Sequence, residues 1–144
     1  MTRRYRPVRS TLELLAALAA STAIPALAHH NGLTYFDLDT TVEHTDVTVV
    51  SYDLVNPHGR LVYRFTAESG ETIEWTAELS SANNMRRRGL GADLFKPGVR
   101  LTSVSGSPSR SGSNFMRLDR AVFENGDVAQ ITGSSAGFTP AGKN

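Results

Sequence analysis

The chain has 144 residues, with 15 lysines and arginines, 14 acidic residues and no cysteine, and its formal charge at pH 7 is +1. The absence of cysteine excludes a disulfide framework, thiolate metal sites and cysteine nucleophiles. The length fits one small domain, whose stability then has to come from packing.

The first 28 residues have the pattern of an export signal. A basic start with four arginines precedes an apolar stretch from Leu12 to Leu27, and Ala26 and Ala28 supply the small side chains that signal peptidase requires. Glu13 interrupts this stretch, which is too short for a comfortable membrane span. We therefore expect a signal peptide over residues 1–28, cleavage before His29, and a periplasmic or secreted protein without a transmembrane segment.

Removal of this leader changes the charge of the protein. The mature chain keeps 11 basic and 13 acidic residues, a formal charge of −2. Because nucleic-acid binding depends on clustered cations that neutralise phosphates, we expect no nucleic-acid partner.

Period-two alternation dominates the mature chain and predicts strands. The first run is 47–52, and the clearest hairpin joins 60–66 to 72–78 through a polar turn at 68–71. The only plausible helix lies at 82–88, where serines stand at the cap positions before it and Gly89 can end it.

Further strands are predicted at 99–105, 115–123 and 128–132, with a long polar connection over 106–113. This order is typical of a β-rich domain over 29–133: a small five- to six-stranded Greek-key barrel of the oligonucleotide/oligosaccharide-binding (OB) type. A small β-sandwich is the alternative, because periodicity does not separate the two. Residues 134–144 are small and polar, which predicts a disordered tail.

Three histidines carry the metal-binding hypothesis. If His29 is the first residue of the mature chain, its imidazole and the free amino-terminal amine could chelate one ion. Alternatively, the His30 imidazole could form a planar ligand set with the amine and one deprotonated backbone amide. His58, or less favourably His44, could add a ligand after folding. Nitrogen ligands without sulfur favour Cu(II), Ni(II) or Zn(II), and copper fits best. The alternative is a solvated terminus that binds metal only adventitiously.

Other candidate residues each have a structural alternative. Asn56-Pro57-His58 most simply links two strands, and in a barrel this linker lies at the rim where ligands bind. The run from Arg86 to Arg88 could attract an anion or an envelope partner, with Arg87 and Arg88 as the candidate contacts. A solvated face with one arginine packed on Glu74 or Glu78 is favoured instead. Trp75 is expected in the core or half-core rather than stacked on a sugar.

Catalysis finds little support in the sequence. It has no Gly-x-Ser-x-Gly nucleophile motif, no paired carboxylates in a predicted cleft and no glycine-rich phosphate loop. We therefore expect a non-catalytic binding or accessory domain, with copper as the leading ligand. The alternatives are a structural or protein-interaction module of the cell envelope and a small-ligand or carbohydrate binder, both without metal.

An ordered set of short motifs carries a family resemblance. Over roughly 29–112 the chain resembles a family of small exported bacterial proteins of unknown function. The resemblance implies no established activity. Leu90 departs from the family pattern, which usually has an aromatic residue there. The motifs in chain order are His29-His30, Phe36-Asp37, Asn56-Pro57-His58, Trp75, Arg87-Arg88-Gly89 and Lys96-Pro97-Gly98.

Overall fold

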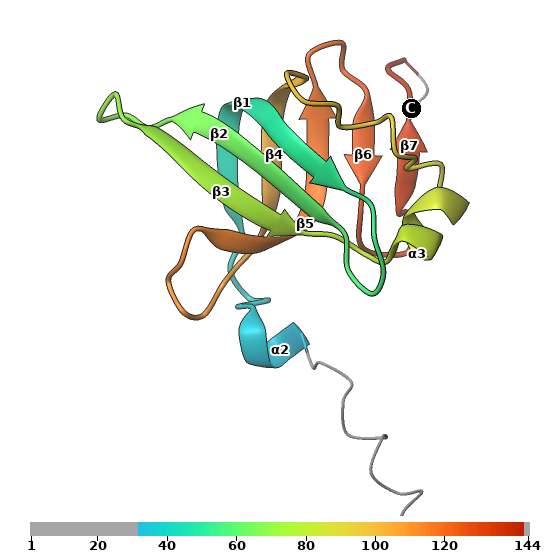
Figure 1. Cartoon of the computed structure of the whole chain (residues 1–144), viewed down its shortest axis with the longest axis horizontal. Helices are drawn as coiled ribbons and strands as arrows, with labels where there is room; N and C mark the ends of the chain where they lie inside the picture. Colours follow the sequence, from blue (N-terminus) through green and yellow to red (C-terminus); the bar gives the residue numbers. More distant parts are fainter. Residues whose placement is uncertain (1–31, 143–144) are drawn as a thin grey trace, which may run out of the picture. The chain divides into compact units, whose positions relative to one another are not determined.

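The computed structural model describes residues 32–142, which form a β-barrel with two short helices (Figure 1). Within this range no helix has the length and apolar character needed to cross a bilayer. The elements in chain order are α2 (Gly32–Tyr35), β1 (Val42–Asp53), β2 (Arg60–Thr66), β3 (Thr72–Glu78), α3 (Ala82–Arg87), β4 (Arg100–Pro108), β5 (Phe115–Phe123), β6 (Val128–Gln130) and β7 (Gly137–Thr139).

Five strands close the barrel. β1 pairs antiparallel with both β2 and β4, β2 pairs with β3, and β4 pairs with β5. A short parallel pairing between β3 and β5 completes the ring. This is the strand order of an OB-type barrel, so the predicted small β-barrel is confirmed. β6 and β7 extend the sheet beyond β5.

The β2–β3 hairpin shows why alternation predicted it correctly. Leu61, Tyr63 and Ala77 are fully buried in the core, while Trp75, in phase with Ala77, is half-buried as expected. Arg60 and the other residues of opposite phase point to the outside. The barrel thus has an apolar inner face and a polar outer face along this hairpin.

The long strand β1 departs from simple alternation. Val47 and Val49 are buried, but the pairing with β2 shifts register between Val49 and Ser51. Because of this bulge Tyr52, rather than Ser51, packs on the core, with its ring 5.2 Å from that of Phe95. Bulges of this kind bend a strand, and here one strand serves two neighbours in the barrel.

The predicted helix is present as α3 and contributes to the core. The hydroxyl of Ser81 accepts a hydrogen bond from the backbone N–H of Asn84 at 3.3 Å, which caps the helix. Ala82 and Met85 are buried. Gly89 follows the helix with φ of 74°, the left-handed conformation expected of a terminating glycine.

Two predictions for the C-terminal third are wrong in part. Gly106 and Pro108 belong to β4 rather than to a polar connection, which is confined to the residues between β4 and β5. The segment 137–139, predicted to be disordered, forms β7 and pairs with β6. Phe138 explains this result, because its ring packs against Phe123 at a centroid distance of 6.1 Å.

Candidate functional site

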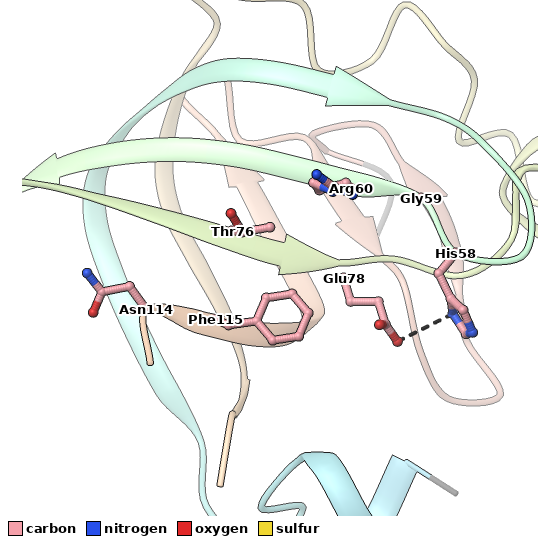
Figure 2. Close-up of a pocket in the computed structure, with 7 residues that line it drawn as sticks. All are labelled: His58, Gly59, Arg60, Thr76, Glu78, Asn114 and Phe115. Atoms are coloured by element: carbon pink, nitrogen blue, oxygen red, sulfur yellow. Dashed lines mark ion pairs between the residues drawn. The ribbon is translucent and has the colours of Figure 1, made fainter. Parts of the chain in front are cut away.

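A pocket of about 320 Å³ lies on the outer side of the barrel, where β2 begins and β3 ends (Figure 2). The β1–β2 loop, β2, β3 and the start of β5 all contribute to it. In OB folds this region is the usual place for a ligand. The lining residues are His58, Gly59, Arg60, Thr76, Glu78, Asn114 and Phe115.

His58 and Glu78 form an ion pair at the edge of this pocket. His58 Nδ1 lies 3.3 Å from Glu78 Oε1, and the exposed fractions of the two side chains are 45% and 29%. Figure 2 shows the two side chains turned toward one another. The carboxylate engages one ring nitrogen, so the other nitrogen, Nε2, is left for a further partner.

Arg60 stands directly opposite Glu78 in the β2–β3 register, yet the two do not pair. Glu78 turns to His58 instead, and among the described residues no acidic group lies within ion-pair distance of Arg60. Arg60 therefore lines the pocket without an ion pair to any residue of the described part of the chain.

The remaining walls are polar on one side and aromatic on the other. Two hydrogen bonds hold Asn114 in place. Its side-chain amide donates to the backbone carbonyl of Glu74 at 3.3 Å, and its backbone carbonyl accepts from the backbone N–H of Thr76 at 3.0 Å. The ring of Phe115 is supported by that of Phe36, with centroids 5.4 Å apart. These contacts connect the β4–β5 loop to β3 and fix the pocket wall.

His29 and His30 lie outside the described residues, so the structure does not place them relative to His58. Among residues 32–142 no three His, Asp or Glu side chains are grouped as a metal site would require. His58 and Glu78 are therefore not part of a three-residue metal cluster within the described range.

His44 lies on the other face of the hairpin from His58. Its Nδ1 is 2.8 Å from the Tyr63 hydroxyl, its ring stacks on Phe65 at 4.1 Å, and Trp75 meets it edge-on at 4.4 Å. Burial lowers the pKa of His44 and raises that of Tyr63. The imidazole and the phenol hydroxyl thus share a hydrogen bond within an aromatic cluster, away from the pocket that His58 lines.

Asn56 precedes the pocket in the loop that joins β1 to β2, as predicted. It is exposed and forms a cis peptide bond with Pro57, but it does not line the pocket. The same loop contacts the start of α3, because the N–H of Ala82 donates to the carbonyl of Val55 at 3.0 Å.

Arg87 and Arg88 lie at the opposite end of α3. Arg87 donates to the side chain of Asn84, and Arg88 Nη1 donates to the carbonyl of Ile131 at 3.2 Å. An arginine of this run was expected to pack on Glu74 or Glu78, but the ion pairs of the described residues include none between this run and either glutamate, and Glu78 pairs with His58. The two arginines and Asn56 are therefore not brought together into one anion site.

Sequence reasoning missed Glu78, Arg60, Asn114 and Phe115. The first two could have been found, because a hairpin with Thr66 opposite Thr72 places Arg60 opposite Glu78. Asn114 and Phe115 reach the pocket only through the parallel pairing of β3 with β5. No local pattern in the sequence signals such a non-local contact.

A family model matches residues 17–116, and its description is a family of unknown function (DUF6152). The match includes the three histidines of the metal hypothesis, the run of arginines and the chain as far as the start of β5. No curated protein and no solved structure matches the chain.

Proposed function

The chain belongs to DUF6152, a family of unknown function, and we propose that it is an exported, non-catalytic domain that binds a transition metal ion. The ion is held by His29 and His30 at the mature amino terminus together with His58, and Cu(II) is the best candidate. A role in metal storage, delivery or sensing in the periplasm follows from this chemistry.

The observation that carries the proposal is the orientation of His58. Histidines that bind metals commonly present one ring nitrogen to the ion while a carboxylate or carbonyl engages the other. Glu78 stands at Nδ1 of His58, at 3.3 Å, and the imidazole is partly exposed. The pair therefore supplies an oriented, accessible Nε2 at the rim of a pocket.

The ligand set determines the metal. An amino-terminal amine has a pKa near ~7.7 and imidazole near ~6.5, so both offer lone pairs at a near-neutral pH with little proton release. Sites of nitrogen and oxygen ligands without sulfur favour Cu(II), Ni(II) or Zn(II) over Cu(I), and Cu(II) is the strongest binder among the divalent ions.

The test is a Cu(II) titration of the mature protein with its native amino terminus, after mass spectrometry has established that it begins at His29. We expect one ion per chain, with binding weakened at least about tenfold by His29→Ala, His30→Ala or His58→Ala. Glu78→Gln should weaken it less, because the amide still engages His58.

His44→Asn is the matched control, since this histidine packs on the inner face of the hairpin and should not affect the titration. Binding that is unchanged in His58→Ala, and no tighter than to a short peptide of the same amino-terminal sequence, would refute a folded site. In that case the terminus binds copper only as a solvated chelate.

A further inference from the structure

The pocket contains Arg60 and Phe115, which have no part in the metal proposal, beside Glu78, which does. We propose that it is a binding site for a small zwitterion of the α-amino-acid class with an apolar side chain. The carboxylate contacts Arg60, the ammonium group contacts Glu78, and the apolar side chain lies against Phe115. This site does not depend on a bound metal ion.

Two unlike charges face the pocket without neutralising each other. Arg60 and Glu78 are cross-strand neighbours, and residues directly opposite in an antiparallel pair have Cβ atoms about 4.5–5.5 Å apart. Glu78 pairs with His58 while Arg60 pairs with no acidic group of the described chain. A basic and an acidic side chain thus border one pocket as cross-strand neighbours, without an ion pair between them.

A ligand of a single charge fits this arrangement less well. A simple carboxylate would gain the guanidinium of Arg60 but would also meet the Glu78 carboxylate, and like charges at this range repel. A simple amine would gain the carboxylate of Glu78 but would also meet the guanidinium of Arg60. A zwitterion gains both contacts and adds no net charge to the pocket.

The other walls suit the body of such a ligand. Phe115 offers an aromatic surface that Phe36 supports from behind. Thr76 and Asn114 also line the cavity and make part of its wall polar. A volume of about 320 Å³ lies at the small end of ligand pockets, which suits a single amino acid rather than an oligomer.

The experiment uses protein freed of metal with a chelator and three probes: L-phenylalanine, 3-phenylpropionate without the amine, and 2-phenylethylamine without the carboxylate. Calorimetry should show binding of L-phenylalanine, with each truncated probe at least about tenfold weaker. Arg60→Gln should weaken L-phenylalanine binding by about the same factor and remove the advantage over 2-phenylethylamine. Glu78→Gln should remove the advantage over 3-phenylpropionate.

Arg64→Gln is the matched control. Arg64 stands four residues after Arg60 on the same face of β2, opposite Glu74, and does not line the pocket. It should leave the affinity within about twofold. Equal losses in Arg60→Gln and Arg64→Gln would overturn the assignment, as would a carboxylate probe that binds as tightly as the zwitterion or the absence of any binding.

Copper binding and amino-acid binding are tested independently by the variants of the terminal histidines. His29→Ala and His30→Ala should weaken Cu(II) binding at least about tenfold and leave L-phenylalanine binding unchanged. Loss of amino-acid binding in these two variants would contradict an independent site.

Discussion

The imidazole of His44 is enclosed by the aromatic side chains of the β2–β3 hairpin. It stacks on Phe65, meets the edge of Trp75 and shares a hydrogen bond with Tyr63. Burial disfavours the charged form and lowers the pKa of His44 below its ordinary value of 6.5. Protonation of this residue therefore opposes the folded state.

This lowered pKa predicts a stability that depends on pH. Below about 6.5 the unfolded chain binds a proton at His44 more readily than the folded chain does, so the free energy of unfolding falls as pH falls through this range. Urea titrations at several pH values should show this slope in the wild type and a flatter one in His44→Asn, whose amide oxygen can still accept from Tyr63.

The fluorescence of Trp75 should report the protonation of His44. It is the single tryptophan of the chain, and its ring lies 4.4 Å from His44. A protonated imidazole quenches indole fluorescence, so the emission of the folded protein should decrease as His44 titrates. His58→Asn, a change at an exposed histidine, should keep this titration. A His44→Asn variant with the same curve would contradict the assignment.

Gly106 lies in β4 where the backbone of β5 leaves no room for a side chain. A Cβ at this position would lie 2.0 Å from the carbonyl oxygen of Arg117, which is backbone and cannot move aside cheaply. Gly106→Ala should therefore cost about 1–3 kcal/mol or more, measured by denaturant unfolding. Gly91→Ala is the control, because nothing lies within 4 Å of its Cβ position, and it should stay within about 0.5 kcal/mol.

At the scale of elements, local signals decide what the sequence could predict. The hairpin from Arg60 to Glu78 and the helix that Ser81 caps have their determinants within a few residues, and both are present as predicted. β7 has no such signal: Gly137, Phe138 and Thr139 sit in a polar tail, and only the contact with Phe123 and the edge of β6 gives them order.

β7 is therefore expected to contribute modestly to stability. A chain that ends after Ser135 loses Phe138 from the core and should be less stable by roughly 1–2 kcal/mol, the value for a partly buried aromatic side chain. A chain that ends after Pro140 keeps β7 and serves as the control. Equal unfolding midpoints for both truncations would show that β7 adds nothing.

At the scale of the whole molecule, the pocket and the barrel depend on the same non-local pairing. The parallel contact between β3 and β5 closes the ring and also brings Asn114 and Phe115 to the pocket. Periodicity finds strands but not their partners, so the sequence predicted the barrel only through element order. The sequence identified His58 as an isolated candidate. The hairpin register could have added Arg60 and Glu78, whereas Asn114 and Phe115 reach the pocket only in the closed barrel.

Closure through β3 and β5 predicts one cooperative core. Met116 is fully buried and stands opposite Ala77 at this seam. Met116→Ala should lower the free energy of unfolding by about 2–5 kcal/mol, because it leaves a cavity where the two strands meet.

Trp75 fluorescence reports the β2–β3 hairpin and circular dichroism reports all strands. The two unfolding transitions should shift together to lower denaturant concentration. Val55→Ala, at an exposed residue of the β1–β2 loop, should change either midpoint little. A fluorescence transition that precedes the circular dichroism transition in Met116→Ala would mean that the hairpin opens alone and that the seam is not part of a single core.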